Sequence, residues 1–160
     1  MNPNEIAKNF FNDIIIKVIP FEQNNYKYIA VMHKSNASNS EMYVRASILV
    51  QDGTSYKELW KKELNLDVDV TEKQFDVRYI DKDSKKYVCY ASLSEGSHTG
   101  SGTVGEYSVL DNQDYSVIVA DDVFDPVSGD IESDPFVAVD LPRRAIDIRA
   151  KLLKDYNKLQ

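Results

Sequence analysis

The chain has few of the residues that build covalent frameworks or membrane anchors. Cys89 is the one cysteine in 160 residues, which excludes an intrachain disulfide and a cysteine-rich structural zinc site. The start of the chain lacks the basic residues and the cleavage site of a secretory leader. Asn12, Asp13 and Lys17 interrupt its apolar run, so it does not read as a membrane span. The sequence therefore predicts a cytoplasmic protein that makes no membrane contact.

Positive charge is also scarce, but only in one part of the chain. The formal net charge is −7, which argues against a nucleic-acid-binding surface covering the whole protein. Residues 87–142 contain no Lys or Arg and eleven Asp or Glu, whereas residues 1–86 are neutral overall and residues 143–160 carry a net charge of +4. A segment of fifty-six residues without a positive charge cannot neutralise its own carboxylates. These acids must face water, a metal ion or cations elsewhere.

The remaining composition is that of a globular protein. Apolar residues make up 42% of the chain, and ten Tyr, six Phe and one Trp supply large groups to bury. A chain of this length suits one domain, so we predict a single domain over residues 1–160. It can bury roughly 70% of the surface that its unfolded form exposes.

Helix signals lie at both ends of the chain. Asn2 is a suitable cap, Pro3 fits the first helical position, and apolar residues follow at a spacing of four. The helix is expected to stop near Asp13, where three isoleucines favour a strand. A second amphipathic helix is predicted over about residues 143–158, because apolar residues recur there at steps of three and four.

Between these helices the sequence predicts mainly β-structure. The expected strands span residues 26–34, 41–51, 74–81, 85–93, 105–111, 115–121 and 135–141. Asp52 and Gly53 mark a turn. Residues 55–64 are predicted as a short helix from the spacing of their apolar residues, with a hairpin strand as the competing interpretation. The predicted fold class is α+β, a single domain with an antiparallel β-sheet and helices at the N- and C-termini.

The run from Gly100 to Gly105 matches the pattern G-x-G-x-x-G, which cradles a phosphate in some folds. A dinucleotide site of this kind needs a helix directly after the glycines, and β-formers and a turn follow instead. No Lys or Arg occurs in the next 37 residues to meet a phosphate. We therefore predict a mobile connecting loop and no cofactor.

The sequence evidence for other candidate sites is weaker still. His33 has an H-x-S spacing found in phosphoesterases that use two histidines, but His98 does not repeat it. Cys89 lies on an alternation that predicts a buried, inert thiol on the core face of a strand. The acids of residues 121–134 do not follow the spacing of a calcium-binding EF-hand loop, and we predict no metal site.

The uneven charge supports one functional hypothesis: a non-enzymatic inhibitor or binding protein that occludes a basic partner, such as a nuclease or another nucleic-acid-handling protein, without itself binding nucleic acid. A fixed array of carboxylates attracts a Lys- and Arg-rich cleft, and apolar neighbours anchor it. Small acidic immunity proteins and phage-encoded inhibitors share this profile, although no motif assigns the chain to one family. The predicted contact residues are Asp111, Asp114, Asp121, Asp122, Phe124, Asp125, Asp130, Glu132 and Asp134.

Two alternatives belong to other classes of protein. The chain is compatible with a small enzyme or ligand-binding domain whose pocket has His98 at its mouth as an acid–base group. It is also compatible with a structural subunit that assembles through the C-terminal helix. A third arrangement, in which the basic residues of that helix neutralise the late acids internally, would remove the need for a partner.

Overall fold

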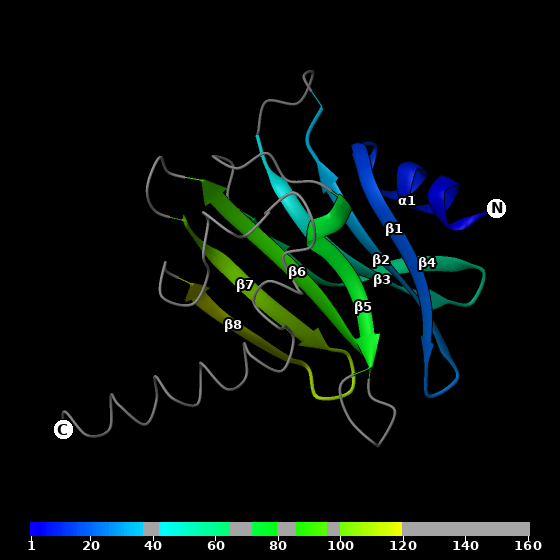
Figure 1. Ribbon diagram of the computed structural model, residues 1–160. Helices are drawn as coiled ribbons and strands as arrows, with labels where there is room; N and C mark the ends of the chain where they lie inside the picture. Colours follow the sequence, from blue (N-terminus) through cyan, green and yellow to red (C-terminus); the bar gives the residue numbers. More distant parts are fainter. Residues whose placement is uncertain (37–41, 65–71, 80–85, 96–99, 120–160) are drawn as a thin grey trace.

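The computed structural model describes residues 1–36, 42–64, 72–79, 86–95 and 100–119 (Figure 1). The elements in chain order are α1 (Pro3–Phe11), β1 (Ile14–Gln23), β2 (Tyr26–Lys34), β3 (Val44–Asp52), β4 (Ser55–Glu63), the 3₁₀ turn η1 (Glu72–Gln74), β5 (Phe75–Tyr79), β6 (Lys86–Glu95), β7 (Gly100–Ser108) and β8 (Gln113–Val119). The predicted late strand (135–141) and C-terminal helix (143–158) lie outside the described residues.

Helix α1 begins and ends where the sequence indicates. The Asn2 side chain accepts a hydrogen bond from the Glu5 backbone N–H at 2.9 Å, and Pro3 occupies the first turn. Asn12 adopts a left-handed conformation and its N–H bonds the Lys8 carbonyl, which closes the helix. The predicted stop near Asp13 is therefore confirmed, and the chain enters β1 directly.

The strands form two antiparallel sheets, each a meander in chain order. Strands β1 to β4 make sheet A and strands β5 to β8 make sheet B. Asn24 and Asn25 both have positive φ in the β1–β2 turn, as a tight hairpin requires, and Gly53 serves the β3–β4 turn in the same way. The prediction of one sheet is corrected to two, because β4 and β5 do not pair and the chain starts a second meander after η1.

Where a helix is predicted over residues 55–64, the structure has strand β4 (Ser55–Glu63), the competing interpretation. Register with β3 slips between Ile48 and Leu49, so that Leu59 is an extra, bulged residue. The bulge places Tyr56 against the outer face of sheet A and Trp60 against the inner face. Tyr56 and Trp60 thus lie on opposite faces of a strand. Their separation of four residues equals that of apolar residues on one face of a helix, and this equality explains the wrong prediction.

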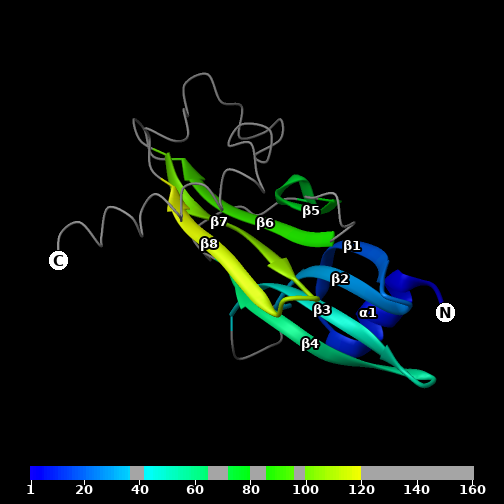
Figure 2. The ribbon, with the colours of Figure 1, turned by 90° about the horizontal axis from the view of Figure 1, so that it is seen from below.

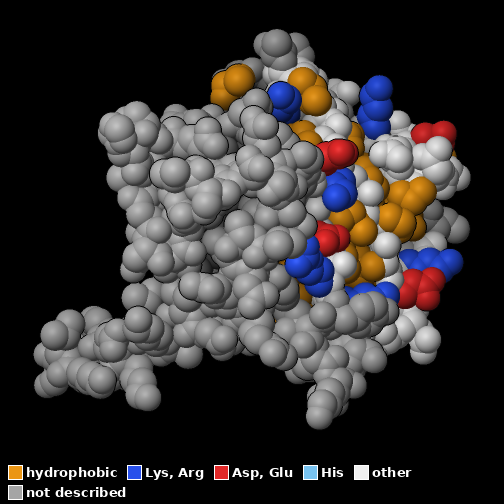
Figure 3. Space-filling view, viewed as in Figure 1, with side chains coloured by type: hydrophobic (Ala, Val, Ile, Leu, Met, Phe, Trp, Pro, Cys, Tyr) orange, Lys and Arg blue, Asp and Glu red, His pale blue; other side chains and the backbone are white. Residues whose placement is uncertain are grey.

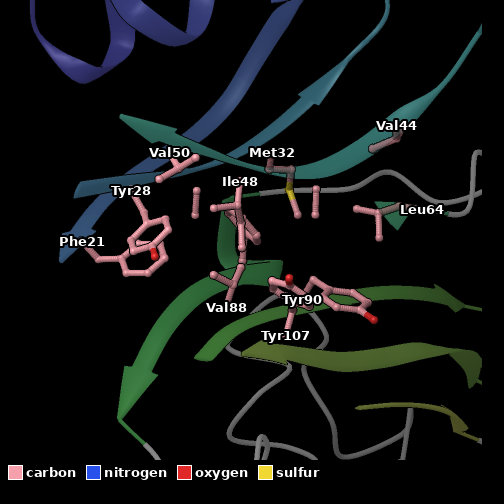
Figure 4. Close-up of a cluster of buried hydrophobic side chains, with 13 residues drawn as sticks. Phe21, Tyr28, Met32, Val44, Ile48, Val50, Leu64, Val88, Tyr90 and Tyr107 are labelled. Atoms are coloured by element: carbon pink, nitrogen blue, oxygen red, sulfur yellow. The ribbon is translucent and has the colours of Figure 1, made fainter. Parts of the chain in front are cut away.

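The main core lies between the two sheets. Figure 4 shows side chains of β2 and β3 pointing toward those of β6 and β7, and Figure 2 shows the sheets as two layers. The buried residues of this main core are Phe21, Tyr28, Ala30, Met32, Val44, Ala46, Ile48, Val50, Leu64, Phe75, Val88, Tyr90 and Tyr107. The alternation of Tyr87, Cys89, Ala91 and Leu93 predicts the core face of β6. Tyr87, Cys89 and Ala91 are buried, but Val88 and Tyr90 on the opposite face form the inter-sheet core.

Polar contacts tie the two sheets together at both sides. Lys17 Nζ donates to the Phe75 carbonyl at 3.0 Å, and the Lys86 N–H donates to Gln23 Oε1 at 2.8 Å. On the other side, Lys62 Nζ of β4 lies 3.1 Å from Asp114 Oδ2 of β8. The sheets are therefore fixed against one another by hydrogen bonds as well as by apolar packing.

A second, smaller core lies on the outer face of sheet A, where α1 covers it (Figure 2). Ala7 of the helix packs with Ile29, Val31 and Leu49 of the central strands. The predicted α+β class, with antiparallel sheets and an N-terminal helix, is confirmed. In the part of the chain that the structure describes, no helix has both the length and the apolar character needed to cross a bilayer.

Candidate functional site

Only two of the predicted contact residues, Asp111 and Asp114, lie in the described part of the chain. Asp111 is exposed in the β7–β8 turn, and its N–H donates to Ser108 Oγ at 3.2 Å. Asp114 accepts a hydrogen bond from the Tyr90 hydroxyl and forms the ion pair with Lys62. Asp114 thus has a structural role, because it connects β8 to β4. The other seven contact residues, from Asp121 to Asp134, lie outside the described residues.

A third acid of the Lys- and Arg-free segment, Glu106 on β7, is completely buried. Among the residues that the structure describes, neither carboxyl oxygen has a hydrogen-bond partner. Burial raises the pKa of this carboxyl to about 8, because the ionised form loses its hydration. Glu106 is therefore mainly protonated at pH 7 and does not contribute to an anionic surface.

Charges of both signs alternate over the visible described surface. On the face shown in Figure 3, Lys and Arg side chains stand beside Asp and Glu side chains among hydrophobic ones. Among the described residues, Arg45 forms an ion pair with Glu63 across β3 and β4. No acidic patch gathers on the described part of this face.

A buried polar cluster that the sequence did not predict lies at the C-terminal end of α1. We call it the His33 network, and it consists of Asp13, His33, Tyr43 and Ser47. His33 Nδ1 lies 2.7 Å from Asp13 Oδ2, and Nε2 lies 2.8 Å from Ser47 Oγ. The Tyr43 hydroxyl donates to the same carboxylate at 2.7 Å. Asp13, His33 and Ser47 are buried, with His33 only 1% exposed.

These contacts determine which ring nitrogen of His33 carries the hydrogen. A carboxylate can only accept, so Nδ1–H donates to Asp13 and Nε2 of the neutral ring accepts from the Ser47 hydroxyl. Burial lowers the pKa of His33 because it penalises the charged ring, and nearby Arg45 acts in the same direction. The hydrogen bond and the charge of Asp13, and the charge of Glu63, oppose this effect without cancelling it.

The order Asp13, His33, Ser47 is that of the triads that activate a serine nucleophile. Here, however, Ser47 is 0% exposed on the central strand β3, and a substrate carbonyl has no access to its oxygen. The arrangement satisfies three buried polar groups and joins the end of α1 to β2 and β3. Its geometry is that of a structural network.

We expect a fluorophosphonate probe, which labels serines activated by a histidine, to leave Ser47 unmodified in the folded protein. The reason is steric, because the hydroxyl is buried and already donates to His33. Intact-mass spectrometry of the wild type and of Ser47→Ala measures this directly. Labelling of the wild type that disappears in Ser47→Ala would instead identify a serine hydrolase.

The sequence also singled out Cys89, the glycine run and His98, and the structure describes the first two. Cys89 is fully buried as predicted, and burial followed by the nearby charge of Glu106 raises the pKa of its thiol well above the usual value. Gly100 to Gly105 form part of strand β7, which corrects the predicted mobile loop. His98 lies outside the described residues. Among the described residues, no group of three or more His, Cys, Asp or Glu is placed to hold a metal ion.

The position of Gly105 has a packing explanation. Gly105 pairs with Tyr90 of the neighbouring strand, and the Tyr90 ring lies over the glycine. A Cβ at this position would overlap the Tyr90 ring. The glycine therefore makes room for a buried aromatic residue.

The His33 network escaped the sequence analysis because its members are distant in the chain. The local H-x-S spacing pointed to Ser35, whereas the structural partners are Asp13 and Ser47. One usable signal was a histidine directly after the apolar run 29–32, since a buried polar group needs partners.

Comparisons of this chain with protein-family models, with curated proteins and with solved structures gave no match.

Proposed function

We propose that this protein is a cytoplasmic, non-enzymatic binding protein that occludes a basic partner, of the kind that handles nucleic acid. The observation that carries the proposal is the absence of Lys and Arg from residues 87–142, which contain eleven acids. Such a segment attracts cationic surfaces over distances of about 10 Å at moderate salt.

The described part of this segment supplies a fixed support for the contact. Strands β6, β7 and β8 form a continuous antiparallel meander, and Asp114 holds β8 to β4 through Lys62. Strand β8 ends at Val119, directly before the acids that begin at Asp121. Asp121 and Asp122 thus follow the edge strand β8 within three residues in the sequence.

The partner is identified by capture on the immobilised protein from the native host, followed by mass spectrometry. Its affinity is then measured for the wild type and for the triple variant Asp121→Asn, Asp122→Asn, Asp125→Asn. We expect the triple variant to bind about tenfold or more weakly at low salt, because three carboxylates that face the partner are removed. Wild-type affinity is expected to fall steeply with salt concentration.

A matched control removes the same charge from the other sheet. Glu22, Asp52 and Glu58 are exposed on sheet A, and their replacement by Gln, Asn and Gln changes the net charge equally. This variant is expected to bind the partner almost as well as the wild type. Equal weakening of both variants, or a salt-independent affinity, would reject the proposed contact surface.

A further inference from the structure

Helix α1 is held on sheet A by the outer core and by a set of contacts at its C-terminal end. The Phe11 ring stacks on the His33 ring with 3.9 Å between centroids. The Asn12 carbonyl accepts from Asn36 Nδ2 at 3.0 Å, and Asp13 enters the His33 network directly after the helix. The helix has nine residues and one buried side chain, Ala7. A helix this short is not stable in water without tertiary contacts, so it depends on the outer core and on these C-terminal contacts, which we call the anchor.

The anchor is complete only while the His33 ring is neutral. The neutral ring donates from Nδ1 to Asp13 and accepts at Nε2 from Ser47, so each polar atom of the ring is satisfied. A second proton on Nε2 would point at Ser47 Oγ, whose own hydrogen would then lose its acceptor. The site is closed to water that could compensate, because His33 is 1% exposed and Ser47 0%.

The charged groups around His33 do not remove this cost. Asp13, which follows α1, favours the protonated ring, as does Glu63 of β4 from a greater distance, whereas Arg45 of β3 opposes it. Arg45 also pairs with Glu63 and so weakens its influence. From α1 the ring meets Phe11, which is apolar, and on β1 it lies opposite Ile15. Desolvation remains the largest effect, and it acts against the proton.

We propose that the His33 network is a pH-dependent latch, which holds α1 on sheet A while His33 is neutral and releases it when His33 takes up a proton. Release would expose the apolar outer face of sheet A, where Ile29, Val31 and Leu49 are covered by the helix. The inter-sheet core, on the opposite face, would stay intact. The released state is therefore a folded protein with a new apolar surface.

The latch predicts a local and acid-dependent opening. With the full-length protein, hydrogen exchange of the α1 amides is measured from pH 8 to pH 5 and expressed as protection factors, which remove the chemical pH dependence of exchange. We expect α1 protection to fall by about tenfold per pH unit below the ordinary histidine pKa of about 6.5. Protection of the β2 and β3 amides is expected to persist over the same range.

Two variants and one spectroscopic measurement make the result decisive. In His33→Gln the side chain cannot take up a proton, so α1 protection should no longer depend on pH, whereas His98→Ala should behave as the wild type. If His33→Gln does not fold, the ring NMR signals of wild-type His33 give its titration, whose midpoint must coincide with the loss of α1 protection. Unchanged protection while His33 titrates, or simultaneous loss in β2 and β3, would overturn the latch.

Discussion

Replacing Glu106 by Gln is expected to raise the free energy of unfolding at pH 8 and to change it far less near pH 4.5. Burial raises the pKa of the folded-state carboxyl to about 8, against 4.5 for the unfolded chain. Between these values the folded state binds the extra proton, so wild-type stability falls by about 1.4 kcal/mol for each pH unit of increase. Gln cannot ionise, so the variant lacks this loss.

Urea unfolding at several pH values measures the effect, because the slope of stability against pH is the quantity at issue. Gln still buries an amide without partners, and this constant cost shifts the whole curve without changing its slope. The control is Glu58→Gln, which removes an exposed carboxyl from β4 and should retain the wild-type slope. Parallel profiles of stability against pH for the wild type and Glu106→Gln would contradict the raised pKa of the Glu106 carboxyl.

Gly105→Ala is the second substitution for which we expect a large effect. The added Cβ would overlap the Tyr90 ring, which is fully buried and hydrogen-bonded to Asp114. Tyr90 also packs against Trp60, with 5.8 Å between ring centroids, so the ring cannot move aside freely. Overpacking of this kind costs about 1–3 kcal/mol, and disturbance of the hydrogen bond to Asp114 adds to it.

A double-mutant cycle separates the steric effect from other consequences of losing a glycine. In a Tyr90→Leu background the ring is absent, so the same Gly105→Ala change should cost much less. Chemical denaturation of the four proteins gives the coupling energy. An equal cost in both backgrounds would mean that the glycine serves backbone conformation and not the packing of Tyr90.

Local chemical signals predicted the helix and most strand positions. The cap at Asn2, the isoleucine run after Asp13 and the turn at Gly53 act through neighbours in the chain, so their physics is visible in the sequence. Strand β4 was mispredicted because a bulge at Leu59 depends on pairing with β3. The face of β6 predicted as buried is buried, but the sequence did not show that the opposite face forms the inter-sheet core, because both faces of that strand are buried and alternation cannot rank two buried faces.

The candidate sites depended even more on tertiary structure. Asp13, His33 and Ser47 meet because two hairpins bring β1, β2 and β3 side by side, and no motif marks that meeting. The burial of Glu106 and the pairing of Asp114 were equally invisible in a count of charges. Composition identified an unusual segment, but the structural role of each acid depends on its surroundings.

The arrangement of the two sheets as successive meanders has a consequence for how the chain acquires its structure. Among the eight described strands, every pair joins neighbours in sequence, so contact order within each sheet is low and each hairpin can close early. Residues 1–64 contain α1, all of sheet A and the outer core, and can begin to fold while the remainder is still being synthesised. Docking of sheet B, which buries the aromatic residues between the layers, has to wait until residues 75–119 have been synthesised.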